Sequence, residues 1–225
     1  MDTPPHTVLI TGASRGIGAA TALACARAGW HVALNYARDA AAAEAVAAQV
    51  RALGVRALAV QADVADEAAV MAMFARIDAE LPPLRGLVNN AGVVDVAARV
   101  DEMSMARVQR MFAVNVLGSF VCAREAVKRM STRHGGAGGA VVNLSSAAAR
   151  IGSPGQYVDY AAAKGAIDTF RCRKRLVDIC SCNTISHQCK FKIAFGALAQ
   201  AALARKFGEV VEICCGRRHS ASQLG

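Results

Sequence analysis

The sequence is poor in aromatic residues and has no long uninterrupted apolar run. Aromatic side chains make up only 5% of its 225 residues, so Ala, Val and Leu must supply most of the packing. No apolar stretch approaches the ~18–20 residues that a membrane-spanning helix needs. The N-terminal MDTPPHTVLITG lacks a basic segment followed by a long apolar one, so no secretory signal is predicted. We therefore expect a cytoplasmic protein.

Acidic residues are scarce near the C-terminus, and proline is absent after Pro154. Residues 1–170 carry 16 Lys or Arg and 14 Asp or Glu, whereas residues 171–225 carry ten and three. A basic segment can bind nucleic acid or an anionic membrane. This one contains no recognisable binding motif, so neither partner is expected. An interaction role for the basic segment is an open alternative.

Six of the eight cysteines also fall after residue 170, where disulfides are not expected in a reducing cytosol. Zinc knuckles use paired C-x-x-C spacings, and this segment has only C-x-C, H-x-C and C-C. We predict no metal site. The potential ligands considered are Cys180, Cys182, His187, Cys189, Cys214 and Cys215.

Residues 1–170 alternate between short β-branched or apolar runs and longer Ala-rich helical runs. Strand–helix alternation with apolar, non-alternating strands predicts a parallel sheet covered by helices on both faces, a doubly wound α/β fold. The predicted strands are 7–11, 31–36, one within 55–64, 86–92 and one following the glycines at 135–139. The predicted helices are 16–29, 40–54, 66–81, about 104–131, and one that begins between 154 and 160 and continues to about 179.

The glycine-rich stretch TGASRGIG follows the first predicted strand and opens the first predicted helix. Its G-x-x-x-G-x-G spacing places Gly12, Gly16 and Gly18 where a dinucleotide-binding loop has its glycines. Glycine permits a tight turn and close approach of a pyrophosphate, and the helix N-terminus offers unpaired N–H groups. The alternative is a plain strand–helix turn that needs glycine for its backbone alone.

The tip of the second predicted strand lacks the carboxylate that would bind an adenosine ribose 2′-hydroxyl. It reads Asn35, Tyr36, Ala37 and then Arg38, with Asp39 past the usual position. Arg15 lies inside the glycine loop. Two guanidinium groups without a carboxylate at the tip favour a 2′-phosphate, so NADP is predicted and NAD is the less favoured cofactor.

Several motifs in register resemble the short-chain dehydrogenase/reductase family: TGASRGIG (11–18), Asp63-Val64, NNAG (89–92), Asn115, Ser146 and Tyr160-x-x-x-Lys164. The resemblance implies a Rossmann-type fold and is nearest to 3-oxoacyl-carrier-protein reductases and glucose-dehydrogenase-like enzymes. It implies that Asp63 binds adenine, with Val64 beside it, and that Asn89, Ala91 and Gly92 line the cofactor. The full set predicted to bind the cofactor is Gly12, Ser14, Arg15, Gly16, Ile17, Gly18, Arg38, Asp63, Val64, Asn89, Ala91 and Gly92.

The resemblance also implies a catalytic set of Asn115, Ser146, Tyr160 and Lys164. Asn115 would hold a water in a proton relay, and Ser146 would bind the substrate oxygen, with Ser145 the less favoured serine. An unperturbed phenol is a poor base at neutral pH, and a lysine four residues on along one helix face favours the phenolate. Tyr160 would then act as the acid/base in hydride transfer between an alcohol or ketone and the cofactor.

Residues 171–225 match none of the motifs that family members carry after the Tyr–Lys helix, so we divide the chain into a core of residues 1–170 and an atypical basic segment. A change of reading frame or exon structure near residue 170 is our hypothesis for this junction. Beyond the helix that continues to about 179, the predicted elements are a helix at 197–208 and a strand at 209–215. The fifth strand would then keep an exposed edge. A homo-oligomer is usual in the family and doubtful here, and a catalytically impaired nucleotide-binding protein is the alternative function.

Overall fold

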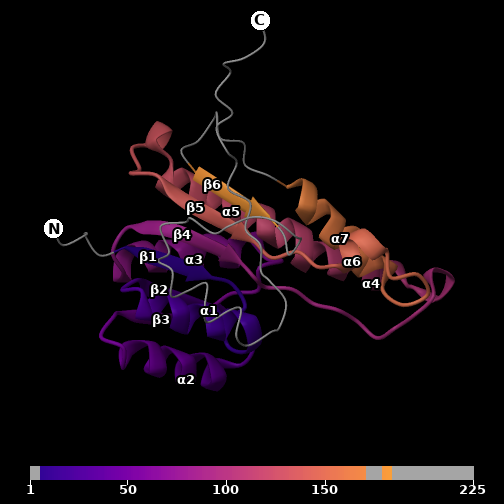
Figure 1. The fold of residues 1–225 in the computed structure, drawn as a ribbon, viewed down its shortest axis with the longest axis horizontal. Coiled ribbons are helices and arrows are strands. Elements are labelled where there is room, and N and C mark those ends of the chain that lie inside the picture. Colours follow the sequence, from indigo (N-terminus) through magenta and orange to yellow (C-terminus); the bar gives the residue numbers. More distant parts are fainter. Residues whose placement is uncertain (1–5, 171–178, 184–225) are drawn as a thin grey trace, which may run out of the picture.

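The computed structural model describes residues 6–170 and 179–183 of the chain. The described residues form a parallel sheet of six strands in the order β3-β2-β1-β4-β5-β6, which crosses Figure 1 from β3 to β6. The strands are β1 (Thr7–Ile10), β2 (His31–Tyr36), β3 (Ala57–Gln61), β4 (Leu84–Asn89), β5 (Gly139–Asn143) and β6 (Ile179–Asn183).

The helices connect these strands, and some of them begin at a residue whose side chain caps the first turn. Asp39 and Asp66 cap two of them, since each carboxylate accepts a backbone hydrogen bond from the third residue on, at 2.9 and 3.1 Å. The helices are α1 (Gly16–Arg27), α2 (Ala40–Arg51), α3 (Glu67–Glu80), α4 (Met105–Phe112), α5 (Gly118–Met130), α6 (Ala148–Ile151) and α7 (Val158–Thr169), with a π-helix η2 (Ala113–Leu117) and 3-10 turns η1 (Val100–Glu102) and η3 (Thr132–His134).

Two apolar clusters cover the two faces of the sheet. Successive side chains of a strand point to opposite faces, so Leu9 joins one cluster and its neighbour Ile10 joins the other. The first cluster packs α3 and α5 against the sheet, and its Phe74 side chain is fully buried. The second packs α1 and α2 against the opposite face. The doubly wound prediction is therefore confirmed.

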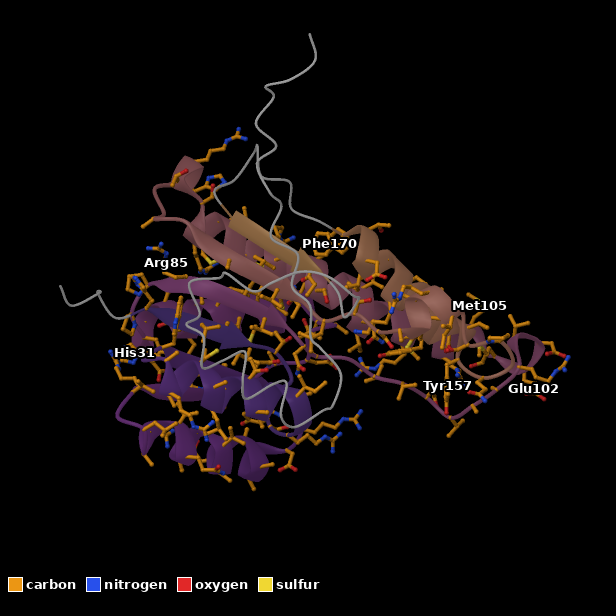
Figure 2. All side chains as sticks on the ribbon, viewed as in Figure 1. His31, Arg85, Glu102, Met105, Tyr157 and Phe170 are labelled. Carbon is orange, nitrogen blue, oxygen red and sulfur yellow. The ribbon has the colours of Figure 1, made fainter. Side chains whose placement is uncertain are left out.

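The strand order places β1 between β2 and β4, so the direction of winding reverses beside β1. In such sheets ligands bind in the crevice at the carboxyl ends of the strands next to this switch point. Figure 1 shows α4, α6 and α7 beyond that end of the sheet. Figure 2 places His31 and Arg85 at the amino ends of their strands, with Met105 and Tyr157 at the far end. The functional residues are therefore expected at the α4–α7 end.

Two expectations for the later part of the core are wrong. Helix α7 ends at Thr169 and does not reach Ile179, which begins β6. Strand β6 pairs with β5 over five residues, from Gly139 with Ile179 to Asn143 with Asn183, so β5 has no free edge there. The mixture of polar and sulfur-bearing residues in Ile179–Asn183 gave no period-2 pattern to predict this strand. The short helix α6 was not predicted, and the elements expected at 197–208 and 209–215 lie outside the described residues.

Candidate active site

A cavity of about 660 Å³ opens at the carboxyl ends of β1, β2, β3 and β4. Its size falls within the range of small-molecule and cofactor sites. Nine of the twelve residues predicted to bind the cofactor line it: Gly12, Ser14, Arg15, Ile17, Arg38, Asp63, Val64, Ala91 and Gly92. Gly16, Gly18 and Asn89 are not among its lining residues, and neither are Asn115, Ser146, Tyr160 and Lys164.

The glycine loop is shaped by close backbone contacts. Gly12 has a φ of +62°, and a Cβ there would lie 3.0 Å from the Cα of Ala91. A Cβ on Gly18 would lie 2.4 Å from the carbonyl oxygen of Gly12, so this glycine permits α1 to approach the loop. Arg15 precedes α1, and no side chain caps the helix there. The exposed N–H groups at this N-terminus fit a pyrophosphate.

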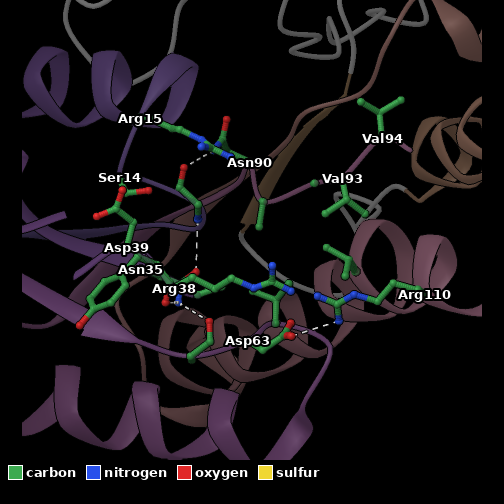
Figure 3. A pocket seen from close by; sticks show the side chains of 18 of the residues that line it. Ser14, Arg15, Asn35, Arg38, Asp39, Asp63, Asn90, Val93, Val94 and Arg110 are labelled. Atoms are coloured by element: carbon green, nitrogen blue, oxygen red, sulfur yellow. Dashed lines mark hydrogen bonds and ion pairs between the residues drawn. The ribbon is translucent and has the colours of Figure 1, made fainter. Parts of the chain in front are cut away.

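The end of β2 presents Tyr36, Arg38 and Asp39 to the cavity, where Asn35 and Asp39 also make hydrogen bonds within the fold. Asn35 is buried, accepting from the Gly12 N–H at 3.2 Å and donating to the Ala62 carbonyl at 2.9 Å. The carboxylate of Asp39 caps α2 through the Ala42 N–H. Figure 3 shows the Arg38 side chain among the residues that line the cavity. Among the described residues, the Arg38 guanidinium has no ion-pair partner.

Asp63 holds a position beside β3 through both of its carboxylate oxygens. One oxygen accepts from the Ala65 N–H at 3.0 Å, and the other pairs with Arg110 at 3.0 Å (Figure 3). Both side chains of the ion pair are partly exposed and line the cavity. Asp63 follows β3, whereas Arg110 comes from α4, so the pair connects two elements of the cavity wall. Sequence reasoning assigned Asp63 and missed Arg110, because nothing near Arg110 in the chain indicates a partner 47 residues away.

The NNAG turn after β4 contributes its second asparagine to the cavity and its first to the core. The amide nitrogen of Asn89 donates to the Ser119 carbonyl at 3.0 Å and to Asn143 at 2.8 Å, away from the cavity. Asn90 instead lines the cavity and donates to the carbonyls of Thr11 and Gly12, at 2.7 and 2.9 Å. The turn therefore ties the glycine loop to β4.

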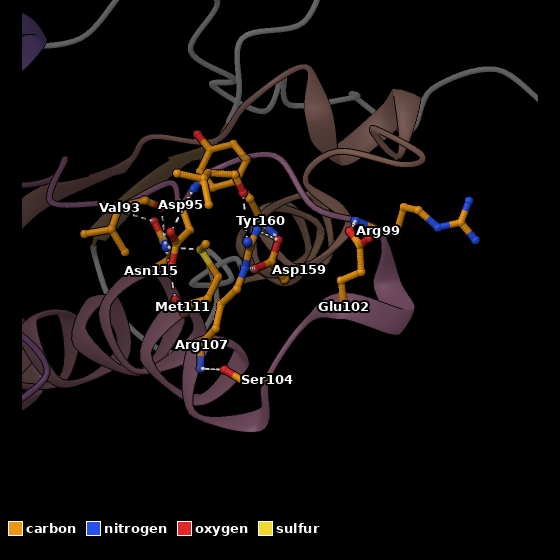
Figure 4. Close-up of polar contacts among 11 residues, drawn as sticks. Val93, Asp95, Arg99, Glu102, Ser104, Arg107, Met111, Asn115, Asp159 and Tyr160 are labelled. Carbon is orange, nitrogen blue, oxygen red and sulfur yellow. Dashed lines mark hydrogen bonds and ion pairs between the residues drawn. The ribbon is translucent and has the colours of Figure 1, made fainter.

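Asn115 is the central residue of the π-helix η2 and is fully buried. Its side-chain amide forms two hydrogen bonds with the backbone of Val93: it donates to the carbonyl at 2.9 Å and accepts from the N–H at 3.2 Å (Figure 4). A π-turn inserts an extra residue into a helix and is frequent at functional sites. Here it brings the Asn115 side chain to the cavity loop, where a Cβ on Gly92 would lie 2.7 Å from the Asn115 Oδ1.

Tyr160 and Lys164 lie one turn apart on α7, as the sequence predicted for a shared helix face. The Lys164 Nζ lies 5.7 Å from the centroid of the Tyr160 ring and donates to the Leu144 carbonyl at 2.8 Å. The Lys164 ammonium also borders Gly92, at 3.7 Å from where a Cβ would stand. Gly92 lines the cavity, so Lys164 adjoins the cavity at this residue.

The two serines after β5 differ in their partners. The Ser145 hydroxyl is buried and donates to the Lys164 carbonyl at 3.2 Å, which occupies it within the fold. Ser146 is half-buried, and its hydroxyl accepts from the Ala148 N–H at the start of α6 at 3.2 Å. A hydroxyl that accepts one hydrogen bond can still donate its proton to a substrate oxygen. The geometry is therefore compatible with the preference for Ser146.

Burial lowers the pKa of Lys164 from its ordinary 10.5 to about 8, with Asp168 opposing the shift. Below pH 8 this lysine is charged in the folded and unfolded chain, and burial costs about 3 kcal/mol of stability. Between pH 8 and 10.5 the folded protein loses the proton first, so the cost falls as the pH rises.

Replacing Lys164 with methionine should reveal this cost. We expect the free energy of unfolding of the variant, minus that of wild type, to be about 3 kcal/mol larger at pH 7 than at pH 10.5. Urea denaturation at the two pH values measures the difference. A difference between variant and wild type that is the same at both pH values would contradict the lowered pKa.

The reversal of winding at β1 and the glycine loop at the cavity are the features of a dinucleotide-binding α/β fold. The sequence model of the short chain dehydrogenase family matches residues 6–175. The chain belongs to the short-chain dehydrogenase/reductase family.

Relatives in this family show how far the similarity extends. The chain is 52% identical over 161 residues to a protein of Escherichia coli K12 named uncharacterized oxidoreductase YgfF, covering 72% of this chain and 65% of that one. It is 39% identical over 163 residues to the 3-oxoacyl-[acyl-carrier-protein] reductase FabG of Staphylococcus aureus Mu50, covering 72% and 63%. A mutant Serratia marcescens short-chain dehydrogenase/reductase superposes with a TM-score of 0.67 at 36% identity, covering 72% and 64%. The chain thus spans just under two thirds of the length of the relatives it matches.

No helix among residues 6–170 and 179–183 is long and apolar enough to cross a membrane. The same part of the chain holds no group of three or more His, Cys, Asp or Glu that could bind a metal ion. The side chains of the six candidate ligands after residue 170 lie outside the description.

Cys25 and Cys122 are free and buried, and burial raises the pKa of each thiol to about 12. Such thiols are poor nucleophiles and serve as core residues.

Proposed function

We propose that the protein is an NADP(H)-dependent oxidoreductase that interconverts an alcohol and a ketone. The observation that carries this proposal is that a cavity with a glycine loop lies next to Lys164, which borders Gly92 and stands one helical turn from Tyr160. NADP(H), when bound, supplies or accepts the hydride at its nicotinamide ring. The chain's own residues would bind the phosphates, orient the ring and move one proton.

The proton step is assigned to Tyr160. Its hydroxyl would donate a proton to the carbonyl oxygen as hydride reaches the carbonyl carbon, and would take the proton back in the oxidative direction. The Lys164 ammonium, held near the ring by the Leu144 carbonyl, would stabilise the phenolate that forms. Ser146 would donate a hydrogen bond to the same substrate oxygen. Asn115 would hold the cavity loop in a fixed position relative to the side chains of Tyr160, Lys164 and Ser146.

A direct test is reduction of a panel of ketones and aldehydes by the full chain with NADPH, followed by oxidation of the matching alcohols with NADP. The proposal expects turnover of at least one pair in both directions. Binding of NADPH without turnover over the whole panel would select the alternative, a catalytically impaired nucleotide-binding protein.

Arg38 is proposed to select NADP(H) over NAD(H). A charge-assisted hydrogen bond to a 2′-phosphate contributes about 1.5–3 kcal/mol, so Arg38→Ala should weaken NADPH binding by about 10- to 100-fold. Affinity for NADH, which lacks this phosphate, should change by less than about threefold. Fluorescence titration of each reduced cofactor measures both constants.

Arg51→Ala is the matched control for Arg38→Ala. Arg51 is also an exposed arginine near an end of α2, but it pairs with Glu44 at 2.7 Å and does not line the cavity. Its replacement should leave both cofactor affinities unchanged. An equal loss of NADPH and NADH affinity in Arg38→Ala would contradict a 2′-phosphate contact.

A further inference from the structure

A buried ion pair joins α4 to the first turn of α7, directly before Tyr160. The Arg107 Nε lies 2.8 Å from one carboxylate oxygen of Asp159, and its Nη2 lies 3.4 Å from the other. The two side chains are 10% and 1% exposed, so both charges are almost fully removed from water. Breaking such a pair by removing one partner leaves an uncompensated buried charge. The proposed chemistry above uses neither residue.

Hydrogen bonds hold Arg107 both at its backbone and at its guanidinium. The Ser104 hydroxyl, which caps α4, accepts from the Arg107 N–H at 3.2 Å. The Arg107 Nη1 donates to the Val96 carbonyl at 2.8 Å, and Figure 4 shows the guanidinium reaching from α4 toward Asp159 and Tyr160. Val96 belongs to the loop that follows β4 and lines the cavity through Val93, Val94 and Asp95. Arg107 lines the same cavity, so one guanidinium holds the cavity loop and α7 together.

Asp159 supplies the side-chain hydrogen-bond acceptor that the start of α7 otherwise lacks. The residue before the helix, Tyr157, makes no side-chain cap, and Asp159 is the acidic residue of the first turn. Its carboxylate accepts from the Tyr160 N–H at 2.9 Å and interacts favourably with the positive end of the helix. Burial alone would raise the pKa of Asp159, but the hydrogen bonds from Arg107 and from Tyr160 hold that pKa below its ordinary value. Asp159 is therefore a permanent anion at neutral pH.

Tyr160 and Lys164 depend on this pair to different degrees. Lys164 is anchored independently, through its Nζ on the Leu144 carbonyl and its own carbonyl on the Ser145 hydroxyl. Tyr160 lies in the first turn of α7, and the ends of helices fray most readily. Besides the ion pair, a backbone bond from the Ala98 N–H to the Gln156 carbonyl at 3.0 Å connects this turn to the loop. Loosening the pair should thus displace Tyr160 more than Lys164.

We propose that Arg107 and Asp159 are positioning residues that fix Tyr160 relative to the cavity loop, and so determine turnover more than cofactor affinity. The assignment of a catalytic outcome rests on the proposed function, because it takes Tyr160 as the acid/base. The positional part does not, since it predicts order in the first turn of α7 whether or not the chain turns over a substrate.

The test replaces both partners with apolar residues, Arg107→Met with Asp159→Leu, so that no single buried charge remains. The full chain should still melt cooperatively. Hydrogen exchange of residues 157–161, followed by mass spectrometry, should become at least about tenfold faster, while exchange in β1 and β4 stays unchanged. For the turned-over substrate, kcat should fall by about 100-fold, with the Kd for NADPH within about threefold of wild type.

Arg107→Lys keeps the charge but cannot form the two-pronged contact, so its exchange rate and kcat should lie between those of wild type and the double variant. The control is Arg76→Met with Glu80→Leu, which removes a half-exposed ion pair on α3 and should change neither quantity. Unchanged exchange at 157–161 in the double variant would overturn the proposal, as would a fall in NADPH affinity as large as the fall in kcat. If the wild type turns over nothing, the proposed function fails separately and the exchange measurement alone decides the role of the pair.

Discussion

Replacing Tyr160 with phenylalanine is expected to lower kcat about a thousandfold and to leave the Kd for NADPH within about threefold of wild type. Phenylalanine keeps the ring that packs against Met111, Val116 and Ala163, so the fold should be preserved. It removes the hydroxyl that we assign as proton donor, which a positioned acid/base group can make worth two to four orders of magnitude in rate. Steady-state oxidation of NADPH and fluorescence titration measure the two quantities.

Tyr157→Phe is the matched control, because Tyr157 is a half-buried tyrosine three residues earlier on the same segment without a lysine four residues on. Its kcat should stay within about threefold of wild type. Retention of more than about a tenth of wild-type turnover in Tyr160→Phe would contradict the assignment of the acid/base.

Gly18→Ala is expected to lower the melting temperature by about 5–10 °C and to weaken NADPH binding. The added Cβ would lie 2.4 Å from the Gly12 carbonyl oxygen and 2.9 Å from the Ala13 Cα. Both are backbone atoms, so α1 must move away from the glycine loop to relieve the contact. That movement shifts the helix N-terminus that is proposed to hold the pyrophosphate. A thermal melt and an NADPH titration measure the two effects.

Gly165→Ala adds the same methyl group to another helical glycine, in α7, where nothing lies within 4 Å of the new Cβ. Alanine is the better helix former by about 1 kcal/mol, so this control should keep or raise the melting temperature. If Gly18→Ala melts like Gly165→Ala and binds NADPH as wild type does, the close approach of α1 to the loop is not required.

The sequence predicted the first five strands and their helices because each carries its own local pattern. Buried apolar runs such as Thr7–Ile10 mark strands, an Ala-rich run from Ala40 marks one helix, and Asp66 marks the start of another. Ile179–Asn183 carries no such pattern, and its pairing with β5 is a long-range contact that the sequence did not indicate. The π-helix around Asn115 was not predicted either, because the sequence there continues the pattern of one long helix.

The cavity lining followed from motifs, whereas the contacts between distant helices did not. Gly12 and Arg38 could be assigned because each follows a strand at a known offset, and Asp63 because it matches a motif of the resembled family; all three line the cavity, where the carboxyl ends of parallel strands meet. Arg107 and Arg110 lie on the polar side of an amphipathic helical pattern, where arginines are ordinarily solvated surface residues. Only the packing of α4 against α7 and the cavity shows that Arg107 meets Asp159 and that Arg110 meets Asp63.

The measurement that tests the central claim most directly is the thermal melt of the full chain with NADPH, with NADH and without cofactor. A ligand that binds only the folded state raises the midpoint, by an amount that grows with its affinity. We expect one cooperative transition, with a midpoint raised more by NADPH than by an equal concentration of NADH. A midpoint that neither cofactor shifts at concentrations up to several millimolar would contradict a functional dinucleotide site at this cavity.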